Sequence, residues 1–157
     1  MDKKIKHPED ALIGVMYDTF QVNADIVVPD TAPQWFLADT QLSQTAKGAA
    51  NKLLAFFSLD KKEMRLTGLL GYEVDKMFKS APPNTIRIAH TPYRHSGRTK
   101  YSDMTIYTTD SGATVFATGS IQWSWGLDDF NAPQLRPQLL SKDAQAITRN
   151  VLAKMIK

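Results

Sequence analysis

The chain has 157 residues, a length typical of one domain that can bury its own hydrophobic core. Its 19 Lys and Arg residues exceed its 16 Asp and Glu residues only slightly and are spread along the chain, which argues against a nucleic-acid-binding surface. The absence of cysteine excludes disulfide bonds, thiolate metal ligands and a thiol nucleophile.

Neither a membrane span nor a secretion signal is visible in the sequence. No apolar run approaches the length that crosses a bilayer, and the first residues, MDKKIKHPED, contain no apolar signal segment. We therefore expect a single domain over residues 1–157, with a flexible N-terminus at 1–7. By default we place it in the cytoplasm, with neither a membrane nor a nucleic-acid partner.

The first third of the chain predicts strands followed by a helix. The apolar and β-branched stretch ALIGVMYDTFQVNADIVVPD predicts one or two strands that end at Pro29. An irregular piece that carries Trp35 follows. Apolar residues then recur at helical spacing, which predicts a helix over Thr45–Phe57.

The middle of the chain is rich in strand signals. Alternation of apolar and polar residues predicts strands at Thr85–His90 and Asp103–Thr108, separated by the long polar loop TPYRHSGRTKYS. Short polar residues and a glycine at Thr109–Gly112 are typical of a tight turn. We therefore predict a hairpin from the second strand to a long strand over Thr114–Trp125.

The last segment predicts an amphipathic helix over residues 141–156. Ser141 is a suitable N-cap, and Asp143 places a negative charge in the first turn. Apolar residues follow at helical spacing, namely Ala144, Ile147, Val151, Leu152 and Met155. The predicted fold class is α/β, leaning towards α+β, with a mixed, largely antiparallel sheet and a C-terminal helix packed on it.

Two histidines lie close together in the polar loop: His90 and His95, with Tyr93 between them, which could serve a metal site if a helix brought them to one face. Pro92 and Gly97 favour a loop instead, so we interpret the segment as an exposed basic loop. As an alternative, the loop lines a pocket and offers Arg94 or Arg98 to an anionic ligand. Arg94 and His95 are the candidate ligand-binding residues of this loop.

A second candidate group is Tyr72, Glu73 and Asp75 in the stretch GYEVD. In a strand the two carboxylates would share a face, where they could act as oxygen ligands or form a solvated edge. Neither the Gly-x-Ser-x-Gly elbow nor a glycine-rich phosphate motif occurs in the sequence. No catalytic residue and no metal ligand is therefore assigned.

The stretch GSIQWSWGLDDFNAP holds Trp123 and Trp125, which fall on one face of the predicted strand. Two adjacent indoles can stack on a sugar or a base, and they can equally well pack in a core. Trp35 is a third candidate for ligand stacking. Asp128 and Asp129 are adjacent, and we expect them to hold the turn before Pro133.

Several long stretches resemble the C-terminal part of proteins related to the large (beta) subunit of N,N-dimethylformamidase. They are SGATVFATGSIQWSWGLDDFNAP, LTGLLGYEVD, AQAITRNVLAKM, PEDALIGVMY and VVPDTAPQWFLADTQL. The resemblance runs from about Pro8 to Met155, and its most specific parts are GYEVD and GSIQWSWGLDD.

The resemblance implies a glutamine-amidotransferase-like domain in a family whose namesake hydrolyses a small amide with an iron held by tyrosines and a glutamate. In the family pattern those ligands lie upstream, in part near a His-Asp-Glu-Tyr-Trp-Ser-like segment that this sequence lacks. The resemblance therefore implies iron only if upstream residues complete the site. Residues 44–65 depart from the family pattern and form a helical insert, which could serve as a lid, an interface or a replacement for core.

Three hypotheses follow for the function. The chain is a non-catalytic C-terminal portion of an amidohydrolase-like protein with structural, binding or assembly roles; or it is part of an iron-dependent amide hydrolase completed by another chain; or it is a small carbohydrate- or ligand-binding module. Without the upstream sheet, an exposed edge or apolar face would need cover. We therefore expect a second copy or an upstream catalytic domain or chain as the partner.

Overall fold

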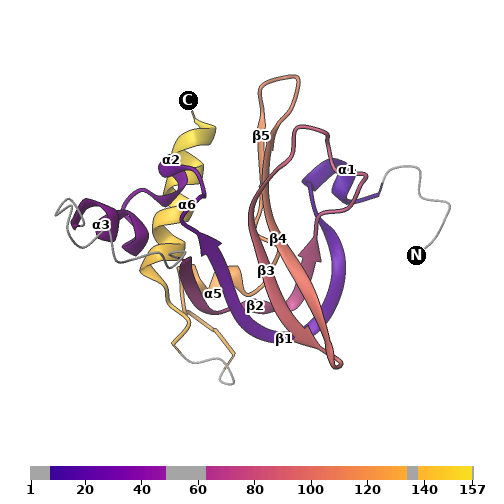
Figure 1. Cartoon of the computed structure of the whole chain (residues 1–157), viewed down its shortest axis with the longest axis horizontal. Coiled ribbons are helices and arrows are strands. Elements are labelled where there is room, and N and C mark those ends of the chain that lie inside the picture. The colour runs from indigo at the N-terminus through magenta and orange to yellow at the C-terminus, as the bar shows by residue number, and fades with distance from the viewer. Residues whose placement is uncertain (1–7, 49–62, 134–137, 157) are drawn as a thin grey trace, which may run out of the picture.

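The computed structural model describes residues 8–48, 63–133 and 138–156 (Figure 1). Five strands form two antiparallel sheets, a pair β1–β2 and a three-stranded sheet in the order β3-β4-β5. This confirms the predicted mixture of helices with largely antiparallel strands. The elements in chain order are α1 Asp10–Ile13, β1 Met16–Pro29, α2 Gln34–Leu37, α3 Gln41–Gly48, β2 Glu63–Lys76, β3 Ile86–His95, β4 Arg98–Thr108, β5 Thr114–Ala117, α5 Trp123–Leu127 and α6 Lys142–Met155.

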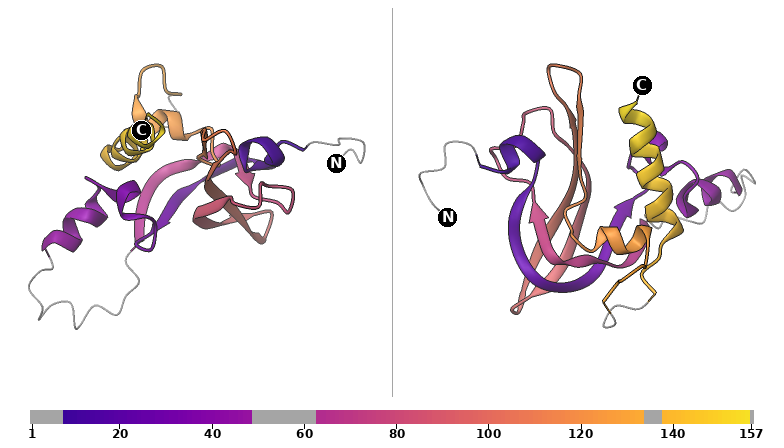
Figure 2. Two further views of the ribbon diagram at one scale, coloured as in Figure 1. Left: turned by 90° about the horizontal axis from the view of Figure 1, so that it is seen from above. Right: turned by 180° about the vertical axis from the view of Figure 1, so that it is seen from behind.

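The β1–β2 pair is a long, strongly bent ribbon. Its register runs from Met16 opposite Lys76 to Pro29 opposite Glu63 and shifts at three places along the way. At one of these shifts Gln21 and Tyr72 both adopt left-handed backbone conformations, with φ of 57° and 58°. Such bulges add local twist, and the ribbon bends into a U that crosses the β3–β4 hairpin (Figures 1 and 2). The first predicted strands are thus one irregular strand.

The segment predicted to be a long polar loop is a β-hairpin, so that prediction was wrong. Strands β3 and β4 pair directly through the two-residue turn Ser96–Gly97, where both residues have positive φ, as the favoured hairpin turns require. Pro92 had suggested a loop. It is tolerated because β3 is an edge strand of its sheet, where a residue without an N–H costs no ladder hydrogen bond.

The predicted hairpin across Thr109–Gly112 is confirmed, but the strand after it is short. β5 ends at Ala117 instead of continuing to Trp125. Gly119 has φ of 73°, and a Cβ atom there would lie 2.3 Å from the carbonyl oxygen of Asp103. Only glycine fits such an approach, and it turns the chain out of the β4 ladder.

The chain then crosses to the other sheet. The backbone N–H of Asp75 donates to the carbonyl of Gly119 at 3.0 Å, and the N–H of Ile121 donates to the carbonyl of Glu73 at 3.3 Å. Residues 118–121 therefore join the two sheets before the short helix α5 begins. The sequence GSIQWSW is not a strand, and its two indoles do not share a strand face.

The C-terminal helix begins as predicted. The hydroxyl of Ser141 accepts the N–H of Ala144 at 3.2 Å, the expected N-cap contact. Asp143 in the first turn accepts the N–H of Gln41 at 2.9 Å, so α6 fixes the start of α3. The last turn differs from the prediction, because Leu152 and Met155 are exposed.

The predicted helix Thr45–Phe57 and the insert over 44–65 overlap the structure only in part. Residues 45–48 end α3, which already begins at Gln41, and Glu63 to Arg65 belong to β2. The remainder of the insert, residues 49–62, and the N-terminal residues 1–7 lie outside the described ranges.

The hydrophobic core lies between the two sheets and helices α2 and α6. Its buried side chains come from β1, α2, β2, β3, β4, α5 and α6 and from Ala32 between β1 and α2. The largest are Phe36, Leu66, Leu69, Leu70, Met104 and Ile147.

Candidate functional site

The outer face of the β1–β2 pair carries two carboxylates flanked by exposed aromatic side chains. In the register, Tyr17 lies opposite Asp75 and Phe20 lies opposite Glu73. Directly opposed residues point to the same face of an antiparallel pair, and the intervening pair of Thr19 and Val74 is buried on the other face. Tyr17 is 46% exposed and Phe20 is 55% exposed.

The carboxylates of this face influence each other. Burial raises the pKa of Asp75, and the nearby charges of Glu73 and Glu9 raise it further, to about 6. The pKa shift caused by Glu73 agrees with the sequence prediction that Glu73 and Asp75 share a face. A carboxylate with a pKa near neutrality exchanges its proton under ordinary solution conditions, which is the behaviour expected of a general acid or base.

Tyr72 and Trp125 meet beside these carboxylates. Their rings form an edge-to-face pair with centroids 5.0 Å apart and an interplanar angle of 90°. Tyr72 reaches this position through its left-handed backbone, a conformation that is rare for a residue with a side chain. The structure therefore brings two predicted candidates together, Tyr72 and Trp125, and Glu73 directly follows Tyr72 in β2.

Trp123 lies elsewhere and is buried. Its indole N–H donates to the hydroxyl of Thr148 on α6 at 3.1 Å, and only 6% of the residue is exposed. Trp123 therefore packs α5 against α6 and offers no ring face to a ligand. The paired stacking surface considered from the sequence does not exist.

Trp35, on α2, borders a different feature. It lines an open cleft of about 370 Å³ together with Ile86 and Ile106 of the three-stranded sheet. The ammonium of Lys154 lies 5.8 Å from the indole ring centroid. This arrangement satisfies the geometry of a cation–π contact.

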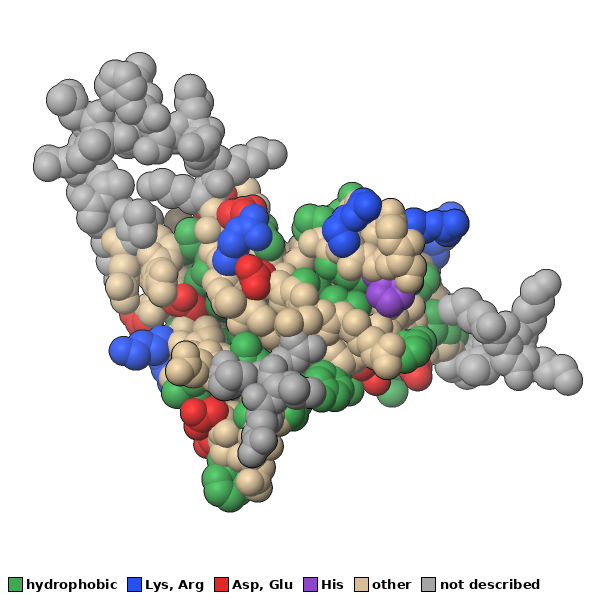
Figure 3. Space-filling view, turned by 90° about the horizontal axis from the view of Figure 1, so that it is seen from below, with side chains coloured by type: hydrophobic (Ala, Val, Ile, Leu, Met, Phe, Trp, Pro, Cys, Tyr) green, Lys and Arg blue, Asp and Glu red, His purple; other side chains and the backbone are tan. Residues whose placement is uncertain are grey.

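Arg94 and His95 are at the tip of the β3–β4 hairpin. On the face seen from below, a histidine lies near basic side chains (Figure 3). The guanidinium of Arg94 donates to the carbonyl of Gly97 at 2.8 Å and to the hydroxyl of Thr99 at 3.1 Å. Arg94 thus braces the turn. His95 ends β3 opposite Arg98, so the two predicted residues belong to a hairpin and not to a long loop.

A half-buried polar cluster ties β1 to this hairpin. Asp18 accepts hydrogen bonds from Lys100 at 3.1 Å and from Tyr93 at 3.2 Å. Burial by itself would raise the pKa of Asp18, but the hydrogen bonds from Thr19 and Lys100 and the charge of Lys100 outweigh it and lower the pKa. Burial raises the pKa of Tyr93 to about 12. Thr19, Tyr93 and Lys100 all donate to the Asp18 carboxylate, as in a structural cross-link.

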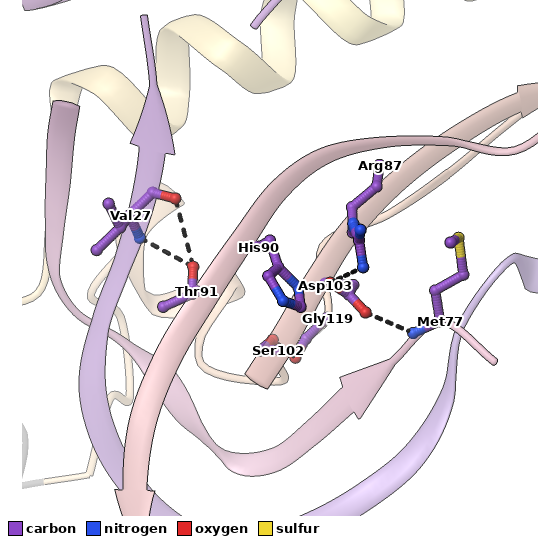
Figure 4. Close-up of polar contacts among 8 residues, drawn as sticks. All are labelled: Val27, Met77, Arg87, His90, Thr91, Ser102, Asp103 and Gly119. Carbon is purple, nitrogen blue, oxygen red and sulfur yellow. Dashed lines mark hydrogen bonds and ion pairs between the residues drawn. The ribbon is translucent and has the colours of Figure 1, made fainter. Parts of the chain in front are cut away.

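Sequence reasoning missed one polar cluster, which is centred on Asp103. Its carboxylate contacts His90 and Arg87 from β3 and the backbone of Met77 (Figure 4). The sequence signal that leads to this cluster is the turn dipeptide Ser96–Gly97, which is typical of a hairpin turn. Once His95 is placed opposite Arg98, counting back along the ladder places His90 opposite Asp103.

Two broader features of the described residues bear on function. Nowhere in them do three or more His, Asp or Glu side chains gather so as to hold a metal ion. None of the helices in the described ranges has the length and hydropathy needed to cross a membrane.

The described residues thus form an α+β fold, with carboxylates and exposed aromatic side chains on the β1–β2 pair and with Arg94 and His95 on the three-stranded sheet. Residues 1–136 match the family described as N,N-dimethylformamidase beta subunit-like, C-terminal. The chain belongs to this family, and the resemblance seen in its sequence is confirmed. No curated protein and no solved structure gives a significant match.

Proposed function

We propose that this chain serves as an assembly domain of an N,N-dimethylformamidase-like amide hydrolase. Its outer β1–β2 face docks against the domain or chain that carries the rest of the active site. The observation that carries the proposal is the set of exposed aromatic side chains around Glu73 and Asp75. The matched family is named for a subunit, which supports a partner polypeptide.

The chemistry of the outer face favours a protein partner. Tyr17, Phe20 and Ile121 are large apolar residues that are each about half exposed. The backbone N–H of Ile121 donates to the backbone carbonyl of Glu73. Aromatic side chains are enriched at the centres of protein interfaces, where burying them contributes most of the binding energy. An exposed group of this kind is therefore better explained by a partner than by solvent.

A second candidate function is favoured by the pKa of Asp75. In an assembled enzyme, the Glu73–Asp75 pair would add a proton-exchanging group to an active site completed by the partner. A carboxylate that titrates near neutrality is suited to this role, because its proton is available in both directions at working pH.

Iron is implied by the family resemblance only if upstream residues complete its site. The described residues hold no group of three or more His, Asp or Glu side chains that could bind a metal ion, and we assign no iron ligand to this chain. Its own residues bind the partner and move a proton at Asp75.

The proposal is tested by purifying the tagged chain from the cell that expresses it and measuring mass, composition and amide hydrolysis of the purified material. We expect a stoichiometric complex with an amidohydrolase-like polypeptide, or with a second copy. Phe20→Ser should abolish it. Ile86→Ser is the matched control, because Ile86 is 57% exposed on the other sheet. A monomer that purifies alone, or a complex unaffected by Phe20→Ser, would refute the assembly role.

The second candidate has its own readout. In the intact complex, Glu73→Gln and Asp75→Asn should each lower kcat for N,N-dimethylformamide by about a hundredfold if the pair transfers a proton. An unchanged kcat, with the complex still assembled, would exclude proton transfer by the pair and leave assembly as the role of this face.

A further inference from the structure

Asp103 is a fully buried carboxylate at the centre of the β3–β4 ladder. Its Oδ2 atom accepts the N–H of Met77 at 2.9 Å, and its Oδ1 atom lies 2.5 Å from Nδ1 of His90 (Figure 4). A buried carboxylate is costly unless it is paired and hydrogen-bonded, and these contacts meet that need. Because Nδ1 of His90 faces Asp103, Nε2 points away from it and is available to a ligand.

The imidazole of His90 is held in one plane. It stacks on the ring of Tyr101 with centroids 4.2 Å apart and only 3° between the planes. Stacking fixes the ring plane and Asp103 fixes the rotation within it, so the direction of Nε2 is set by the protein. Yet 40% of the side chain is exposed to solvent. This is the geometry of a preorganised histidine, held by a buried carboxylate and open on its other edge.

A β-bulge places Arg87 beside this histidine. Arg87 pairs with Thr105 and Ala89 pairs with Met104, so β3 has one residue more than β4 at this point. In a regular strand, residues three apart point to opposite faces. The extra residue brings Arg87 and His90 to the same face, and both approach Oδ1 of Asp103, Arg87 at 3.6 Å. Bulges that re-aim a side chain are typical of functional sites.

The guanidinium of Arg87 has most of its donors free. Its contact with Asp103 is longer than a hydrogen bond, no other bond to it is formed within the described residues, and 43% of the side chain is exposed. Arginine presents a planar fork of N–H donors that matches a carboxylate. Because Nδ1–H of His90 donates to Asp103, Nε2 becomes a second donor when the ring is the imidazolium cation. In that form Arg87 and His90 together can bind one carboxylate from two sides.

The charge of the surrounding face fits an acidic partner. On β3 the exposed residues include Arg94 as well as Arg87 and His90, and none of the residues exposed on β3 or β4 is acidic. From Arg87 to Arg94 the strand spans roughly 23 Å, the length of about seven residues of extended chain. The basic groups repeat along a strand face, which matches an extended polypeptide with several carboxylates.

We propose that Arg87 and His90, oriented by Asp103, bind a carboxylate side chain of an extended acidic polypeptide segment lying along the outer face of β3. This site is on the other sheet from Glu73 and Asp75 and does not depend on the proposed assembly face. Charge complementarity supplies specificity and a fast association rate, and the paired grip on one carboxylate fixes the register.

The test uses the full chain and an end-blocked heptapeptide in which glutamate alternates with serine. Imidazole ¹⁵N NMR signals, assigned to His90 with His90→Gln, are followed during titration with the peptide at low salt. We expect saturable shifts of the His90 signals, and an apparent Kd about tenfold weaker in Arg87→Gln. The matched control is Arg65→Gln, which removes the same charge from an exposed strand arginine that pairs with Glu63. This control should bind within about twofold of the wild type.

Three outcomes would overturn the proposal. The first is a His90 signal that does not move at saturating peptide, and the second is equal weakening by Arg87→Gln and Arg65→Gln. The third is acetate acting as well as the peptide at equal carboxylate concentration, since the occupant would then be a free small carboxylate. A glutamine–serine heptapeptide gives the baseline. Arg87→Lys keeps the charge and should recover only part of the affinity, because lysine lacks the planar fork.

Discussion

Replacing Gly119 by alanine should destabilise the protein by about 3 kcal/mol. The left-handed φ of 73° costs a residue with a side chain about 1 kcal/mol. The added Cβ would lie 2.3 Å from the carbonyl oxygen of Asp103, so the chain must move away. That movement strains two hydrogen bonds to the Gly119 carbonyl, from the Asp75 N–H at 3.0 Å and from the Ser102 hydroxyl at 3.1 Å, each contributing about 1 kcal/mol.

The measurement is urea unfolding followed by circular dichroism, together with the thermal midpoint, which should fall by about 6–12 °C for a chain of this size. Gly112→Ala is the matched control. Gly112 also has a positive φ, 87°, but a Cβ atom added there would meet no atom of the described residues within 4 Å. It should therefore lose only the conformational contribution of about 1 kcal/mol. If the two variants were equally stable, the close approach of Gly119 to Asp103 would not exist as described.

Two further predictions concern single side chains. Because the folded state raises the pKa of Asp75 from 3.8 to about 6, the charged form opposes folding: stability is lost as pH rises from 3.8 to 6, and the effect vanishes below 3.8. Asp75→Asn should therefore be more stable than the wild type at pH 7.5, by on the order of 1 kcal/mol after solvent screening. Near pH 3.5 the two proteins should be equally stable. A variant less stable than the wild type at pH 7.5 would contradict this. Trp123→Phe removes the hydrogen bond to Thr148 and should lower the free energy of unfolding in urea by about 1–2 kcal/mol. Trp125→Phe keeps a ring against Tyr72 and should lower it by less than about 1 kcal/mol. Equal losses would contradict the assignment of Trp123 to the core.

The elements predictable from the sequence were those that local chemistry specifies. The turn at Thr109–Gly112 and the N-cap at Ser141 each depend on residues within four positions of one another, and both are found. The β3–β4 hairpin was missed for a related reason. Pro92 is a local signal against a strand, but its effect depends on whether the strand is at an edge, which is a property of the whole sheet.

The candidate sites depended on contacts that local patterns do not encode. The indole pair was assigned to one strand face because alternation was assumed to continue past Ala117. The strand ends because Gly119 contacts the backbone of Asp103, a residue 16 positions earlier. The pairing of Glu73 with Asp75 was predictable, since they are two residues apart on one strand, whereas the link between Asp103 and Arg87 required the bulge to be known.

The two candidate sites are physically linked through Gly119. Its carbonyl accepts the backbone N–H of Asp75, one of the two carboxylate residues of the outer β1–β2 face. Its Cα lies against the backbone of Asp103, whose carboxylate orients His90. A substitution that displaces Gly119 should therefore disturb both faces together, because one backbone segment holds the two sheets in register. If Gly119→Ala loses both assembly and carboxylate binding, the result therefore does not assign either role to a particular face. Side-chain variants that leave this segment in place separate the two roles: Phe20→Ser should affect assembly alone, and Arg87→Gln should affect carboxylate binding alone.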